Sequence, residues 1–179
     1  MRRRSGIRWQ SLAFGLLIAL VAALCDQVSK AGILSSFRPE GVTETPFLVS
    51  TRVTVLPILD FVLTWNRGVS FGLGNSDGAY NVLLFTGLAL VIGCFLIVWM
   101  ARTSEWLVLV SLGLVVGGAV GNVIDRLRFG AVVDFLYVHI GAFNWWPVFN
   151  VADSAVCVGA ALLVFDSLFA KRDSNMNTQ

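Results

Sequence analysis

Two aspartates, Asp134 and Asp153, stand in apolar surroundings where a carboxylate is unusual. Asp134 interrupts the run Val132-Val133-Asp134-Phe135-Leu136, and Asp153 lies at the start of another apolar segment. Two carboxyl groups that meet at a partly dehydrated site cannot both ionise easily, so they share a proton and their apparent pKa values separate. One can then activate water while the other gives a proton to a carbonyl or a leaving amine. This pair could therefore carry out aspartic-protease chemistry.

Each acid taken alone also has a simple structural interpretation. Asp134 could form an interfacial salt bridge, and Asn150-Val151-Ala152-Asp153 is typical of a helix N-cap with an acid at the third helical position. The helix dipole favours negative charge at such a start, so we expect Asp153 to ionise more easily and Asp134 to hold the proton. A coupled pair titrates jointly, so this division of roles is a hypothesis.

Other polar side chains gather at the ends of the apolar segments. Asp26 and Lys30 are four residues apart, so they face the same way on a helix and can pair. An ion pair that simply ends the segment and a role in orienting a substrate both stay open. Ala152 is small and next to Asp153, so we expect it to leave room for a substrate strand.

The segment before residue 126 combines small and polar faces. Gly113, Gly117 and Gly121 recur at every fourth position, which predicts close contact with another helix. An adjoining face carries a polar patch at helical spacing, made of Gly118, Asn122, Asp125 and Arg126. We expect Arg126 to hold Asp125 or a neighbouring carbonyl as part of the internal scaffold.

Four membrane helices are needed to position these groups. The 179 residues are 56% hydrophobic and only 13% charged, whereas about a quarter of an ordinary soluble domain is charged. Apolar segments predict spans at about residues 12–28, 80–101, 106–125 and 152–170. The expected fold is a single membrane α-helical domain over 1–179, a four-helix bundle with a small extracytoplasmic β-sheet element between spans one and two.

That β element is predicted at about residues 44–66. Two stretches rich in Val, Thr, Phe and Leu, at 47–55 and 58–65, are separated by Pro57, which favours two short strands. The glycines from Gly68 to Gly78 are expected to form a loop that could open for a substrate. Residues 173–179 are expected to be a disordered tail.

Charge distribution predicts the orientation. Arginines before the first span place the N-terminus in the cytoplasm by the positive-inside rule, and four crossings return the C-terminus there. The polar clusters then lie near the extracytoplasmic face. Arg126 and Arg128 break the rule, which agrees with a scaffold role for Arg126. A cleaved signal peptide is disfavoured because no small-residue cleavage site closes the first apolar run.

Several classes of site are not supported. A net charge of +2 with no basic run beyond the first few residues gives no basis for nucleic-acid binding. Cys25, Cys94 and Cys157 show no metal spacing, and we interpret them as small core residues. With His139 as the single histidine, no metal or other cofactor is expected.

Five motifs together resemble, in order, the signature blocks of bacterial lipoprotein signal peptidase, also called signal peptidase II. They are Asp26-Gln27-Val28-Ser29-Lys30, Asn66-Arg67-Gly68-Val69-Ser70-Phe71-Gly72, Gly117-Gly118-Ala119-Val120-Gly121-Asn122-Val123-Ile124-Asp125-Arg126, Val132-Val133-Asp134-Phe135 and Phe149-Asn150-Val151-Ala152-Asp153-Ser154. One departure is Arg67, where the family commonly has Thr or another small residue.

The resemblance implies an intramembrane aspartic endopeptidase of the bacterial inner membrane. It would cleave prolipoproteins just before a diacylglyceryl-modified cysteine, with Asp134 and Asp153 as the catalytic pair. Its partners would be those substrates and membrane lipids, and we expect a monomer. The positions that match the family's supporting or substrate-contacting residues are Asp26, Lys30, Asn66, Gly118, Asn122, Asp125, Arg126 and Asn150.

Two other functions were weighed against this one. A small transporter or channel would spread ionisable groups through the bilayer, whereas here they gather at one face, with only Asp166 deep in span four. A structural subunit of a membrane complex would explain the glycine stripe but not the polar motifs.

Overall fold

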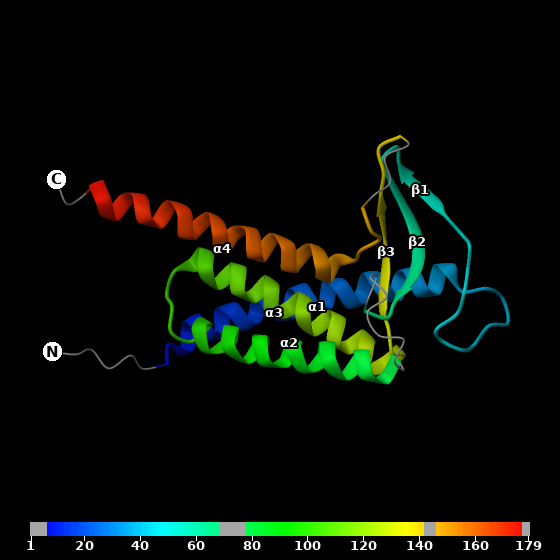
Figure 1. Ribbon diagram of the computed structural model, residues 1–179, viewed down its shortest axis with the longest axis horizontal. Helices are drawn as coiled ribbons and strands as arrows, with labels where there is room; N and C mark the ends of the chain where they lie inside the picture. Colours follow the sequence, from blue (N-terminus) through cyan, green and yellow to red (C-terminus); the bar gives the residue numbers. More distant parts are fainter. Residues whose placement is uncertain (1–6, 69–77, 142–145, 177–179) are drawn as a thin grey trace.

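Four long helices and a three-stranded sheet make up the part of the protein that the structure describes (Figure 1). The computed structural model describes residues 7–68, 78–141 and 146–176. The helices are α1 (Trp9–Phe37), α2 (Gly78–Met100), α3 (Trp106–Phe129) and α4 (Val151–Met176), and the strands are β1 (Val53–Leu56), β2 (Leu59–Asn66) and β3 (Val132–Val138). All four helices contain a stretch long and apolar enough to cross a bilayer. The predicted fold class, a four-helix membrane bundle with a small sheet, is confirmed.

The sheet stands at the end of the bundle away from the start of α1 and the end of α4 (Figure 1). The polar site therefore forms where the helices end and the sheet begins.

Helix α3 packs closely between α1 and α4 because its glycines leave no side chain in the way. A Cβ on Gly113 would lie 2.7 Å from the carbonyl oxygen of Gly15 in α1, and one on Gly117 would overlap the carbonyl oxygen of Ala19. A Cβ on Gly118 would overlap the carbonyl oxygen of Ala152 at the start of α4. The glycine stripe is thus a packing surface, as predicted.

This packing predicts a strong difference between two substitutions. Gly117→Ala forces a methyl group against the α1 backbone, and overpacking of this kind typically costs about 1–3 kcal/mol. Gly87→Ala in α2 meets no atom within 4 Å and serves as the control. Thermal unfolding in detergent should show a lower midpoint for Gly117→Ala only. Equal midpoints for the two variants would contradict close α1–α3 packing.

Helix α1 is longer than the predicted first span. It continues to Phe37, so Asp26 and Lys30 lie inside the helix and are buried instead of ending it at the interface. The extension is stabilised by Ile33 and Phe37, which cluster with Phe135 of the sheet. Helix α1 thereby braces the strand that carries Asp134.

The sheet has the order β1-β2-β3 and is antiparallel throughout. The third strand comes from the segment after α3, so the prediction of a sheet built only from residues between spans one and two is incomplete. In the register of β2 and β3, Thr64 pairs with Asp134 and Asn66 pairs with Val132, with a bulge between Phe61 and Thr64. This pairing brings the motifs around Asn66 and Asp134 together.

Two further expectations need revision, and a third falls mostly outside the described residues. Cys25, Cys94 and Cys157 are exposed, not core, because apolar helix faces in a membrane protein are stable against lipid without burial in protein. Helix α4 continues to Met176, so the tail predicted to be disordered from residue 173 begins as helix. Residues 177–179, and most of the predicted opening loop between Gly68 and Gly78, lie outside the described residues.

Candidate active site

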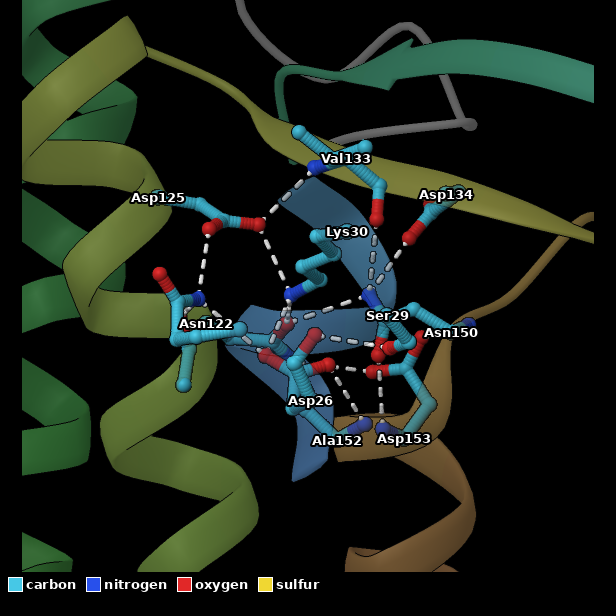
Figure 2. A network of polar contacts seen from close by, with 12 residues as sticks. Asp26, Ser29, Lys30, Asn122, Asp125, Val133, Asp134, Asn150, Ala152 and Asp153 are labelled. Atoms are coloured by element: carbon cyan, nitrogen blue, oxygen red, sulfur yellow. Dashed lines mark hydrogen bonds and ion pairs between the residues drawn. The ribbon is translucent and has the colours of Figure 1, made fainter. Parts of the chain in front are cut away.

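Asn150 joins the two aspartates of the predicted pair (Figure 2). Its side-chain Nδ2 donates to Oδ1 of Asp134 at 2.7 Å, and its backbone N donates to Oδ2 of Asp153 at 3.2 Å. The backbone N of Asp153 donates to Oδ1 of Asn150 at 2.8 Å, which completes the predicted capping box at the start of α4. One residue therefore caps the helix and holds both carboxyl groups.

Two more asparagines hold the outer sides of the pair. Asn122 of α3 donates through Nδ2 to Oδ1 of Asp153 at 2.8 Å, and its Oδ1 accepts from Asn150 at 3.1 Å. Asn66, the last residue of β2, donates through Nδ2 to Oδ2 of Asp134 at 2.9 Å. Neutral amides can accompany either protonation state of a carboxyl group, so they hold its position while a proton moves.

The pKa of Asp134 is shifted to a value useful for acid–base catalysis. The side chain is only 2% exposed, and burial, the largest cause, raises its pKa to about 7 with help from the charge of Asp153. The hydrogen bonds from Asn66 and Asn150 and the positive charge of Lys30 act in the opposite direction. Near neutral pH Asp134 can therefore hold a proton and give it up.

A buried ionic cluster lies beneath the two aspartates, formed by Asp26, Lys30 and Asp125. Nζ of Lys30 lies 2.8 Å from Oδ2 of Asp26 and 2.7 Å from Oδ2 of Asp125, and the three residues are almost completely buried. It also lies 3.2 Å from Oδ1 of Asn122. The ion pair left open by the sequence thus exists, with a second acid from α3 added to it.

The ionic cluster fixes the backbone next to each candidate catalytic acid. Oδ1 of Asp26 accepts from the backbone N of Ala152 at 2.9 Å, and Oδ2 of Asp125 accepts from the backbone N of Val133 at 3.0 Å. Ala152 precedes Asp153 and Val133 precedes Asp134. The cluster therefore positions the start of α4 and the start of β3 relative to α1 and α3 (Figure 2).

These contacts join the five sequence motifs into one polar site, and comparison with known proteins identifies the family. The sequence model of the family Peptidase_A8, described as signal peptidase (SPase) II, matches residues 18–169. The chain belongs to this family. The resemblance inferred from the motifs is confirmed, and membership indicates a protease that spans the membrane several times.

Individual relatives of this signal peptidase II family member support the same assignment. The lipoprotein signal peptidase of Rhodopseudomonas palustris is 43% identical over 160 residues, 86% of this chain and 91% of the relative. That of Methylorubrum extorquens is 46% identical over 155 residues, 85% of this chain and 84% of the relative. A bacterial membrane enzyme solved by the in meso method at 1.9 Å resolution has a TM-score of 0.72 and 25% identity, over 93% of this chain and 99% of that one.

Two predicted site residues of this peptidase take roles in packing. Ala152 is fully buried, and its methyl group faces Gly121 of α3, so the expectation that it leaves room for a substrate strand is wrong. The reason is that α3 and α4 approach most closely here, with Gly118 against the Ala152 carbonyl. Both small residues set the distance between helices.

Arg126 stabilises the end of α3. Its Nη1 donates to the carbonyl oxygen of Asn122 at 3.3 Å, and its guanidinium lies 5.3 Å from the ring centroid of Phe85 in α2. It thus takes the carbonyl, one of the two partners predicted for it, while Asp125 pairs with Lys30.

Gln27 is a site residue that sequence reasoning missed. Its Nε2 donates to Oδ1 of Asp125 at 2.9 Å and to the carbonyl oxygen of Gly121 at 3.2 Å. The sequence did carry a signal for it. Gln27 follows Asp26 in an apolar helix, and an uncharged polar side chain at membrane depth needs a hydrogen-bond partner.

A cavity of about 580 Å³ opens beside Asp153. Asn66 and Asp153 border it, and most of the remaining wall is apolar. It is lined by Asn66, Val138, residues 146–149, Asp153, Ser154, Cys157 and Val158. The cavity follows the first turns of α4 from Asp153 to Cys157 and Val158, which are exposed on the surface of the bundle, so it can receive a substrate that has both a peptide bond and an apolar portion.

Proposed function

We propose that this protein is an aspartic endopeptidase that removes the signal peptide of prolipoproteins by hydrolysing the bond before a diacylglyceryl-modified cysteine. The observation that carries the proposal is the hydrogen bonding of Asp134 and Asp153 to the same Asn150, with the pKa of Asp134 raised to about 7. The names of the relatives, lipoprotein signal peptidases, support the class of substrate.

The two carboxyl groups divide the chemistry between them. Asp153, at the start of α4 where the helix dipole favours negative charge, takes a proton from water as the water oxygen attacks the scissile carbonyl carbon. Asp134 gives its proton to the carbonyl oxygen, which forms a tetrahedral diol. When the C–N bond breaks, Asp153 returns the proton to the leaving amine and Asp134 regains one from the diol. The products are a carboxylic acid and the amine of the new N-terminal cysteine.

The apolar cavity supports a substrate with lipid-like parts. Its wall along α4 includes Cys157 and Val158, and Trp146 and Pro147 close another side. An apolar chain placed there would bring the attached peptide bond next to Asp153. Asn66, which also lines the cavity, is then placed to align the peptide backbone.

Orientation follows from charge and shape together. The arginine-rich start favours the cytoplasm, and α1 begins and α4 ends at the same end of the bundle (Figure 1). We infer that both termini are cytoplasmic and that the site lies near the extracytoplasmic face of the bacterial inner membrane. We also infer that the protein acts as a monomer among membrane lipids and binds no nucleic acid.

Mass spectrometry tests the substrate directly. Purified protein in detergent is incubated with a diacylglyceryl prolipoprotein, and the expected result is a mass loss equal to the signal peptide, with the lipidated cysteine at the new N-terminus. The matched control is the same precursor without the lipid, for which we expect much slower cleavage. Cleavage at any other bond, or none with the lipidated precursor, contradicts the proposed function.

The pKa of Asp134 predicts the pH dependence of cleavage. Because the reaction needs a protonated Asp134, the rate should decline above about pH 7, roughly tenfold per pH unit. Asn66→Ala removes a hydrogen bond that lowers this pKa, so the decline should move to higher pH. Rates measured from pH 5 to 9 check both statements. A pH profile unchanged by Asn66→Ala would contradict the assignment of the decline at alkaline pH to Asp134.

A further inference from the structure

A second polar cluster lies at the far end of the sheet from the two aspartates. Asp60 of β2 is fully buried, and its Oδ2 accepts a hydrogen bond from Nε of Arg52 and forms an ion pair with Nη2 of the same side chain. Nε2 of His139 lies 3.0 Å from the same oxygen. Arg52 precedes β1 and His139 follows β3, so the Asp60 clamp, made of these three residues, ties all three strands together.

Aromatic and hydroxyl groups complete the surroundings of the clamp. The guanidinium of Arg52 lies 5.0 Å from the ring centroid of Tyr137, and Tyr137 stacks on His139 at 5.6 Å. Across the strands, Asp60 is paired with Thr54 on one side and Tyr137 on the other. In the described part of the chain, the charged and titratable groups that face Asp60 are Arg52, His139 and Tyr137.

Asp60 remains ionised in spite of its burial. Burial raises its pKa, but a hydrogen bond from Thr54 and the charge of Arg52, followed by that of His139, outweigh this and hold the pKa below its ordinary value. The carboxylate therefore stays charged at neutral pH, and its contribution to stability is lost only when acid protonates it. Removing that charge leaves Arg52 and His139 without their common partner.

The position of the clamp bears on the register of the strand that carries Asn66. Asn66 is the last residue of β2, and its amide must face Asp134 to donate its 2.9 Å hydrogen bond. A slip of one residue would turn every side chain of β2 to the other face of the sheet. The pairing of β2 with β3 can shift at the bulge between Phe61 and Thr64. A strong contact at Asp60, just before the bulge, therefore helps to hold the register.

We propose that Asp60, held by Arg52 and His139, is a positioning residue that fixes the register of β2 on β3 and thereby keeps Asn66 hydrogen-bonded to Asp134. Asp60 does not touch the reacting atoms and acts on them only through Asn66. Its catalytic consequence rests on the proposed function, whereas its effect on the sheet does not.

Hydrogen exchange measures the effect on the sheet without any substrate. In purified full-length protein in lipid nanodiscs, Asp60→Asn should speed amide exchange in β2 and β3 by at least about tenfold relative to wild type. Glu44→Gln, which neutralises an exposed acid in the loop before β1, is the matched control and should leave exchange unchanged. Unchanged protection of β2 in Asp60→Asn overturns the proposal, whether or not the protein cleaves lipoproteins.

Substitution of the histidine gives the same experiment a second readout. His139→Ala removes the ring whose Nε2 lies 3.0 Å from Oδ2 of Asp60, so it should also speed amide exchange in β2 and β3, although less than Asp60→Asn does. Unchanged exchange in His139→Ala excludes His139 from the clamp.

Cleavage kinetics then separate positioning from general destabilisation. Loss of the Asn66 hydrogen bond raises the pKa of Asp134, so Asp60→Asn should move the alkaline limb of the pH profile upward, as Asn66→Ala does. The double variant Asp60→Asn with Asn66→Ala should show no larger shift of the alkaline limb than Asn66→Ala alone. Arg52→Lys, which keeps the positive charge, should shift the limb less than Arg52→Gln does. A reduced rate with an unmoved profile in Asp60→Asn overturns the link to Asn66.

Discussion

Asp134→Asn and Asp153→Asn should each reduce the rate of prolipoprotein cleavage by at least about 1,000-fold, because each removes a group that transfers a proton in the rate-determining chemistry. Asparagine is nearly the same size and can keep part of the hydrogen bonding to Asn150, so both variants should fold. Initial rates with a diacylglyceryl prolipoprotein measure the effect.

Non-additivity is the signature of a pair. Because either substitution disables the same step, the double variant should be no slower than the slower single variant. Asp166→Asn, an acid on the same helix as Asp153 but near its other end, is the matched control and should keep wild-type activity. Substantial turnover by either Asp134→Asn or Asp153→Asn would show that the two residues do not act as proposed.

Lys30→Met should have the largest effect on stability. It leaves Asp26 and Asp125 buried with no cation between them, and breaking a buried ion pair in this way typically costs about 3–5 kcal/mol. Those two carboxylates accept the backbone hydrogen bonds that position the start of α4 and the start of β3. We therefore expect both a lower unfolding midpoint in detergent and loss of cleavage.

A second substitution distinguishes this cause from loss of packing. Lys30→Met combined with Asp125→Asn removes one of the stranded charges, so the double variant should be more stable than Lys30→Met alone. Ser29→Ala, at the neighbouring position, removes only a hydroxyl bonded to the helix backbone and should be close to wild type. A double variant less stable than Lys30→Met would contradict the electrostatic account of the cluster.

The polar site could be predicted largely because the bilayer makes charge conspicuous. In a chain with 13% charged residues, Asp26 and Lys30 four residues apart, and Asn150 three residues before Asp153, leave few alternatives to a polar site. Helical periodicity fixes which residues share a face, and the capping pattern fixes where α4 begins. Local sequence therefore carried the information for these contacts.

Contacts across the sheet could not be predicted in the same way. The strand β3 was hidden because a short apolar run interrupted by one acid is compatible with a strand or a short buried helix. Its partner in β2 is also far away in sequence, since Val132 pairs with Asn66, 66 positions earlier. The Asp60 clamp depends on that pairing, so nothing in the spacing of Arg52, Asp60 and His139 pointed to it. The buried orientation of Ala152 likewise follows from the approach of α3, not from its neighbours in sequence.

The most direct measurement of the central claim is the pKa of Asp134 with and without the charge of Asp153. It can be followed through the side-chain carboxyl ¹³C resonance of selectively labelled protein in detergent micelles. The expected value in wild type is about 7, and in Asp153→Asn it should be lower because a neighbouring negative charge that raises it is gone. An identical value in both proteins would show that the two carboxyl groups do not share a proton, and would contradict the aspartic mechanism.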